Sequence, residues 1–241
     1  MKRFASLILT LSLAPATSLF AADAVATSIA TNGGSSSSTA YASGNGSAQS
    51  HAAATNGGRA ISNATAIGSR RGEAISTSVA TADRGLAISN ANARANARFG
   101  GRSLAVSDSI AGTVGGVAIS NSDANASSRF GGRAISRSSS IALSTYGTAV
   151  SDSRANSRGR FGGEAIAESD SLADTDGGVA TSSVDVDSDA RFHARSHANG
   201  VGVSVSGPYE RSRANVRASS RATRFGNSRV NATAIEVKRV Y

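Results

Sequence analysis

The chain has 241 residues, no cysteine, 26 glycines and a formal net charge of +9. Leucine, isoleucine, valine and phenylalanine together account for 44 residues, which is below the share, roughly 20% of a chain, that an ordinary globular core requires. Charged residues make up only 17%, so the highly charged composition that is typical of disordered chains is also missing. The composition excludes a conventional core and favours a repetitive architecture that packs small residues closely.

Residues 1–21 form a predicted secretory signal peptide. Lys2 and Arg3 precede an apolar run over residues 4–13, and small residues then lead to a cleavage site near Ala21 or Ala22. The run is too short to span a bilayer, so we expect a secreted protein, extracellular or at the cell surface, without a transmembrane segment. Because a secreted chain without cysteine cannot use disulfides, its stability must come from backbone hydrogen bonds and close packing.

The rest of the sequence divides into three predicted parts. Residues 22–56 form a low-complexity segment rich in Ser, Gly and Ala with irregular repeats, residues 57–192 form regular repeats, and residues 193–241 form a degenerate, Arg-rich repeat or cap. The period of the regular part is 31 residues, because Arg-Phe pairs recur at this interval, with their aromatic residues at Phe99, Phe130, Phe161 and Phe192. Glycines at half this interval divide each unit into two arms joined by turns.

Each arm alternates small and variable residues with a period of two, which is typical of a β-strand. We therefore predict an all-β fold: a right- or left-handed parallel β-solenoid of about 31-residue, two-strand coils with a core of Ala, Ser and Gly. The small residues must face inward because the variable positions include the charges, which are costly to bury. We expect serine ladders along the stack, and a phenylalanine column that is either a corner plug or a binding platform.

Stacking the coils one period apart brings opposite charges into neighbouring positions, where they attract. We therefore expect a stack of parallel coils that are in register. The predicted neighbours are Asp123, Arg154 and Asp185 in one column, Arg137 and Glu168 in a second, and Arg158 and Asp189 in a third.

The outward residues of one arm include an apolar stripe, which we interpret as a contact surface. Alternatively, the N-terminal region or the degenerate C-terminal segment covers this stripe. Its members are Leu104, Val106, Ile110, Ile135, Ile141, Leu143, Ile166 and Leu172.

The C-terminal segment contains a second candidate site, because Arg-rich surfaces attract anionic polymers. The expected partners are anionic polysaccharide, lipopolysaccharide or extracellular DNA. Alternatively, the charge only prevents an exposed strand edge from pairing. The arginines are Arg211, Arg213, Arg217, Arg221, Arg224 and Arg229.

No pattern in the sequence indicates catalysis, so we expect a non-enzymatic protein without a cofactor or a metal. His193 and His197 share a strand face, but no third nitrogen or sulfur ligand is close in the sequence. Serine and aspartate are too abundant to define a catalytic triad. The glycine pairs lack the lysine of a phosphate-binding loop and are interpreted as turns.

In architecture the sequence resembles two groups of repetitive secreted proteins. Its short-repeat plan resembles curli-type amyloid subunits, although it has a single glutamine, Gln49, where those repeats carry ladders of glutamine and asparagine. Its small-residue core is similar to that of repetitive insect antifreeze proteins, although Thr113, Ser144 and Thr175 form one column instead of regular Thr-x-Thr rows. These analogies concern architecture alone and imply no residue roles.

Two functions follow as hypotheses. The first is a secreted structural repeat protein that pairs with itself through its strand edges, as an amyloid-like extracellular fibre, biofilm-matrix or surface-layer subunit. The alternative is an ice-binding, or other repetitive-surface-binding, β-solenoid, because coil spacing and strand spacing together make a face regular in two dimensions.

Overall fold

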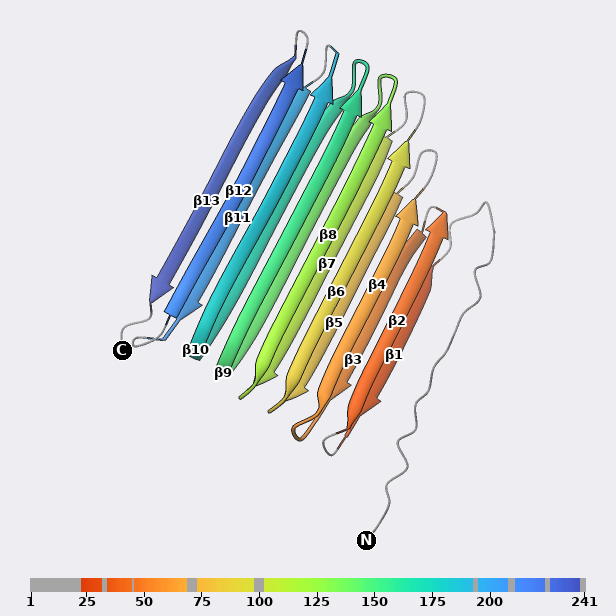
Figure 1. Ribbon diagram of the computed structural model, residues 1–241. Coiled ribbons are helices and arrows are strands. Elements are labelled where there is room, and N and C mark those ends of the chain that lie inside the picture. The colour runs from red at the N-terminus through yellow and green to blue at the C-terminus, as the bar shows by residue number, and fades with distance from the viewer. Residues whose placement is uncertain are drawn as a thin grey trace.

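The computed structural model describes residues 23–31, 34–44, 46–68, 73–97, 102–192, 195–207, 211–223 and 226–238. These residues form thirteen β-strands that stack as parallel coils, so the predicted all-β solenoid is confirmed (Figure 1). The predicted signal peptide lies outside the described residues. The strands are β1 (Ala24–Ala30), β2 (Ser35–Gly44), β3 (Gly46–Ala54), β4 (Arg59–Gly68), β5 (Glu73–Asp83), β6 (Leu86–Ala97), β7 (Arg102–Val114), β8 (Val117–Arg129), β9 (Arg133–Arg160), β10 (Glu164–Arg191), β11 (Arg195–Ser206), β12 (Arg211–Thr223) and β13 (Asn227–Lys238).

The coils build two facing layers. Layer A contains β1, β3, β5, β7, the first halves of β9 and β10, then β11 and β13; layer B contains β2, β4, β6, β8, the second halves of β9 and β10, then β12. Strands β9 and β10 pass through the turn from layer A to layer B without interruption. Figure 1 shows the strands of each layer side by side, with β1 and β13 at opposite ends of the stack. Within the described part of the chain, no helix is long and apolar enough to cross a membrane.

The 31-residue period is one coil. Arg102 lies opposite Arg133, which lies opposite Glu164, which in turn lies opposite Arg195. The coils are shorter near the N-terminal end, where Ala24 lies opposite Ala48. Solenoid strands are thus present on both sides of the predicted 57–192 repeat region, because strands β1, β2 and β3 before it and β11, β12 and β13 after it stack in the same way.

The small residues face the core, as predicted from the alternation. Ala105 and Ser107 in layer A and Ala118 and Ser120 in layer B are fully buried, whereas their sequence neighbours lie on the outer faces. Larger inward residues occur in β10, where Val184 and Val186 are 2% and 0% exposed, and in β12, where the partly buried Val216 packs against them.

Glycines in the facing strand make room for these valines. Gly200 of β11 lies opposite them across the core, where an added methyl group would lie about 3.0 Å from a methyl carbon of Val184, and Gly202 of the same strand lies against Val216 of β12. The inward side chains are therefore not all small, because one layer can carry valine where the facing layer carries glycine.

Serine hydroxyls link the two layers through the core. A chain of hydrogen bonds runs from Ser38 to Ser182, in which each hydroxyl donates to the backbone carbonyl of the preceding serine in the opposite layer, at 2.6–2.9 Å. For example, Ser120 donates to Ser109 and Ser140 donates to Ser120. We expected serine hydroxyls to bond to one another along a column of one layer. In this series of bonds they instead bond across the core, because the backbone carbonyls of the opposite layer lie within reach of a short side chain.

Candidate interaction surfaces

The predicted apolar stripe lies on the outer face of layer A. The register places Leu104, Ile135 and Ile166 in one column and Ile110, Ile141 and Leu172 in another. The second column is longer than the sequence analysis indicated. It continues through Val79 on one side and through Val203 and Ile235 on the other.

Charged side chains flank the first column of the stripe on both sides. Ile135 is only 4% exposed although it is on the outer face. In its own strand it is flanked by Arg133 and Arg137, which form ion pairs with Glu164 at 2.9 Å and Glu168 at 2.8 Å in the next coil. The free apolar surface therefore lies along the Ile110 column.

The two remaining members of the stripe are also separated by other residues. Val106 lies between Ile75 and Arg137, and Leu143 lies between Gly112 and Asp174. The eight residues consequently do not form one continuous apolar surface.

Layer B carries an aliphatic column that sequence reasoning missed. Ile61, Ile88, Ile119 and Val150 follow one another on its outer face. The available signal was the tripeptide Ala-Ile-Ser, which occurs five times in the sequence and supplies the three isoleucines of this column.

An asparagine ladder runs beside this column. The Asn90 amide donates to the side-chain oxygen of Asn63 at 2.8 Å, and the Asn121 amide donates to that of Asn90 at 2.8 Å. Such ladders stabilise stacked, in-register strands. The protein therefore contains an asparagine ladder, although its single glutamine gave no indication of amide ladders.

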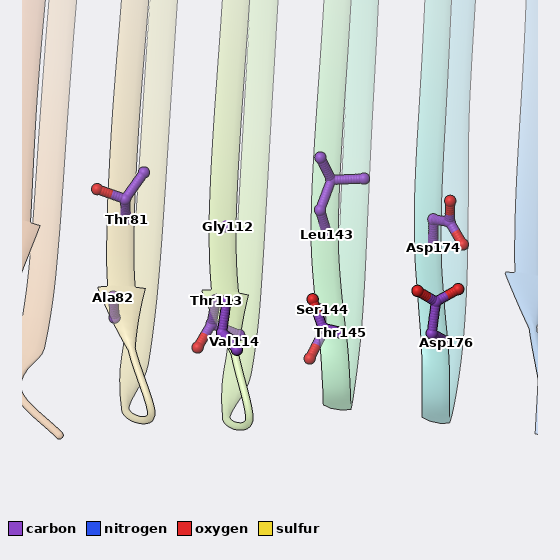
Figure 2. Close-up of a pocket in the computed structure, with 10 residues that line it drawn as sticks. All are labelled: Thr81, Ala82, Gly112, Thr113, Val114, Leu143, Ser144, Thr145, Asp174 and Asp176. Atoms are coloured by element: carbon purple, nitrogen blue, oxygen red, sulfur yellow. The ribbon is translucent and has the colours of Figure 1, made fainter. Parts of the chain in front are cut away.

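An open groove of about 460 Å³ lies at the end of layer A next to the turns (Figure 2). Its floor is Gly112, which leaves a gap in the column between Thr81 and Leu143. Figure 2 shows Asp174 and Asp176 on β10, the strand beside the one that carries Leu143. The described residues contain no group of three histidine, cysteine or acidic side chains that could hold a metal ion.

The histidines are dispersed. His51 lies on β3 and His197 on β11, at opposite ends of the stack, whereas His193 is outside the described residues. The potential pairing of His193 with His197 is therefore not described by the structure.

The predicted charge columns are in register, but not every junction forms an ion pair. Arg137 pairs with Glu168, and Arg154 pairs with Asp185 at 3.6 Å. Burial raises the pKa of Asp123 above its ordinary range, although Arg154 and Arg94 both act to lower this pKa.

The Asp189 carboxylate forms its ion pair within its own strand. Arg158 and Asp189 are neighbours in register. The Asp189 carboxylate nevertheless pairs with Arg191, two residues along β10, at 3.0 Å. Register therefore places the charges next to each other, but side-chain geometry selects the partners.

The C-terminal arginines lie on two different faces. Arg211, Arg213, Arg217 and Arg221 alternate along the outer face of β12 in layer B, whereas Arg229 is on the outer face of β13 in layer A. Arg224 is outside the described residues. Because the layers face opposite directions, these arginines do not combine into one anion site.

The Arg-Phe pairs form the turns that lead from layer B to layer A. Rings of consecutive coils stack, with Phe130 and Phe161 at 5.1 Å and 8° and with Phe161 and Phe192 at 5.0 Å and 7°. The three residues adopt left-handed backbone angles, with φ of 59°, 57° and 60°. This conformation costs about 1–2 kcal/mol per residue, and ring stacking, worth about 0.5–1.5 kcal/mol, offsets much of it.

The phenylalanines line an outer corner instead of filling a cavity, since Phe130 and Phe161 are 50% and 48% exposed. The backbone ladder continues through the corner, where the Phe130 amide donates to Arg160 at 3.1 Å and the Gly131 amide donates to Phe161 at 2.7 Å. The expected stacking along the axis is present, whereas burial as a plug is not. Phe99 and Phe225 lie outside the described residues.

Comparisons with known proteins found no matching family model, no matching curated protein and no matching solved structure.

Proposed function

We propose that the protein is a secreted structural repeat protein that associates with itself to build an extracellular fibre or surface layer. The observation that carries this proposal is the open N-terminal end of the stack. Among the described strands, β1 pairs only with β3 there, and β2 pairs only with β4. Neither end strand contains a charged residue, and Val25 and Ile29 are 65% and 74% exposed. An uncharged, unpaired strand edge is a template for further strands.

The C-terminal end of the described stack is built differently. Glu236 lies on the inward side of β13, opposite Ser204, and its carboxylate accepts a hydrogen bond from the Ala214 amide of β12 at 2.9 Å. Lys238 is also on the inward side. Charges at these positions oppose the addition of another coil, because that coil would bury them. Association therefore starts at the N-terminal end.

Two copies that meet through β1 and β2 would form a rod of double length. Such a contact uses the same surface on both copies, so it closes after two copies and does not extend by itself. Growth into a fibre or layer then requires side-by-side contacts, for which the outer aliphatic columns of Ile110 and Ile119 provide apolar surface.

The test places a charge on β1. Ala26 is on the inward side of the end strand, and Thr27 is on the outward side. We expect the unmodified processed chain to form paired rods and larger assemblies with increasing concentration, seen by analytical ultracentrifugation and electron microscopy. Ala26→Glu should keep it monomeric, because pairing would bury the carboxylate, whereas Thr27→Glu should still associate.

A chain that stays monomeric at all concentrations would overturn the proposal, as would equal association of the two variants. Glu236→Ala gives an independent result at the other end. If that end is closed by charge, this variant should form longer end-to-end assemblies than the unmodified chain.

Ice binding is the second candidate function, and the continuous Ile110 column favours it. One aliphatic residue per coil, from Val79 to Ile235, makes a regular row on the face of layer A. Thermal hysteresis of the monomeric protein, abolished by Ile141→Lys without a change in melting temperature, would support this function. No effect on ice growth would exclude it.

A further inference from the structure

An exposed arginine column runs beside the phenylalanine stack, along one edge of the solenoid. Arg129, Arg160 and Arg191 are neighbours in register, and all three are exposed. Each directly precedes a stacked phenylalanine, whose ring fixes the corner. Neighbouring strands lie about 4.8 Å apart, so the arginines recur at this short interval.

Most of this positive charge is not neutralised within the described residues. Arg191 forms an ion pair with Asp189, but no ion pair links Arg129 or Arg160 to an acidic group in the described ranges. Arg158 and Arg221 occupy the adjacent column on either side of Asp189. Like charges in directly adjacent strand positions repel, so this arrangement is unfavourable until an anionic partner is bound.

The corner is held in a strained conformation that another residue would adopt more easily. Asn56 has a similar φ of 58° at a turn on the opposite edge, and asparagine tolerates this region well. The corner instead repeats phenylalanine in three coils. Their stacking makes a rigid edge that keeps the adjacent arginines in a straight row.

We propose that this edge binds a linear carboxylated polysaccharide, a polyuronate, whose chain runs along the stacking axis. An extended polyuronate presents one carboxylate on every sugar ring, and long, exposed arginine side chains can reach the carboxylates of successive rings. Guanidinium groups bind carboxylates through two parallel hydrogen bonds, which adds geometric selectivity to the charge attraction. This binding does not depend on self-association, so it goes beyond the function proposed above.

Nucleic acid fits the same edge less well. Proteins that bind single strands stack the bases on the faces of aromatic rings, and here each face of Phe161 is covered by a neighbouring ring at 5.0–5.1 Å. The phosphates of a duplex follow a helical path, so a straight row of arginines meets only a few of them. A polyuronate needs no aromatic face on which to stack.

The test compares two double variants that remove the same charge. Arg129→Gln with Arg160→Gln alters the edge, and Arg137→Gln with Arg154→Gln alters outer arginines that are also exposed. The probes are polygalacturonate, its methyl ester and a single-stranded oligodeoxynucleotide, with binding measured by calorimetry at several salt concentrations. We expect the edge variant to bind polygalacturonate at least about tenfold more weakly and the control to change less than about twofold.

The methyl ester should not bind, because it lacks the carboxylates, and added salt should weaken binding to the acid form. The edge variant should also keep or raise the melting temperature, since it removes repulsion between stacked arginines. Equal weakening in both variants would show attraction by net charge alone and overturn the proposal. Equal or tighter binding of the oligodeoxynucleotide would assign the edge to nucleic acid, and an absence of binding to every probe would reject the site.

Discussion

Serine side chains hold the two layers together at close range. The chain of hydroxyl-to-carbonyl bonds from Ser38 to Ser182 crosses the core repeatedly between β2 and β10. Burying such small side chains removes little apolar area, and each hydrogen bond contributes only about 1 kcal/mol. The stability of the core therefore depends on many short contacts, each of which requires the layers to remain close.

A bulky residue on the inward side should separate the layers. Ser138 is 4% exposed and accepts a hydrogen bond from the Ser153 hydroxyl at 3.0 Å, so Ser138→Leu should lower the free energy of unfolding by about 3 kcal/mol or more. The outward Asn125→Leu should change it by less than about 0.5 kcal/mol. Urea denaturation followed by circular dichroism measures both, and equal losses would contradict the assigned faces.

Partly buried aspartates on the outer faces should make stability depend on pH. Burial raises the pKa of Asp108 above its ordinary value of 3.8. A carboxyl group with a raised pKa in the folded state binds its proton more tightly there, so its cost to stability begins as the pH rises through the unfolded-state pKa and is complete above the folded-state pKa.

Asp108→Asn should therefore stabilise the protein at neutral pH and lose its advantage below about pH 4. Asp108 is only partly buried, so solvent screening limits the gain to less than about 1 kcal/mol. Melting temperatures across the range from acid to neutral pH test this. A gain of the same size at every pH would show that the effect does not come from the charge.

At the scale of the elements, the turns from layer A to layer B decide how closely the coils can stack. Gly147 has φ of 150°, and a methyl group there would overlap the Gly116 carbonyl of the preceding coil. The same carbonyl accepts a hydrogen bond from the Thr148 amide at 3.0 Å. Glycine at this turn thus allows the backbone ladder to continue from one layer into the other.

Gly147→Ala should therefore destabilise the stack by more than about 2 kcal/mol, because two backbones must move apart. Gly112→Ala is the matched control, since a methyl group at Gly112 would meet only the Thr81 methyl carbon at 4.0 Å. Thermal unfolding should show a large loss for the first variant and little change for the second. Comparable losses would mean that the turn has room for a side chain.

Ion pairs between coils should each contribute little to the free energy of unfolding, and the pair with the shorter distance should contribute more. Arg137 and Glu168 are 2.8 Å apart, and Arg154 and Asp185 are 3.6 Å apart. All four side chains are well exposed, so a double-mutant cycle should give about 0.5 kcal/mol for the first pair and less for the second. Both values should shrink with added salt. Coupling that is insensitive to salt would contradict an electrostatic origin.

At the scale of the whole molecule, each coil contacts only its neighbours, so the two ends should open before the centre. The strands β9 and β10 are paired on both edges, whereas β13 pairs with β11 alone among the described strands and is exposed along its whole length. Hydrogen exchange measured by mass spectrometry should find the slowest amides in β9 and β10 and the fastest in β13 and β1. Uniform protection from end to end would indicate that the chain unfolds as one cooperative unit.

The sequence determined the architecture of this protein, because its repeat is almost regular. The 31-residue spacing of the Arg-Phe pairs defined the coil, and the period-two alternation placed Ala and Ser in the core. In-register stacking then followed from the complementary charges, such as Arg137 with Glu168. These properties are local or periodic, so they are visible in one dimension.

Only the tertiary structure decided how side chains use that framework. The serine hydroxyls bond across the core, Glu236 lies on the inward side of β13 and accepts a hydrogen bond from the Ala214 amide, and the C-terminal arginines divide between two faces. Each outcome depends on distances between segments of different coils or layers, which the repeat pattern does not specify. The free row at Arg129 and Arg160 likewise became apparent only when the geometry had assigned the acidic partners to other arginines.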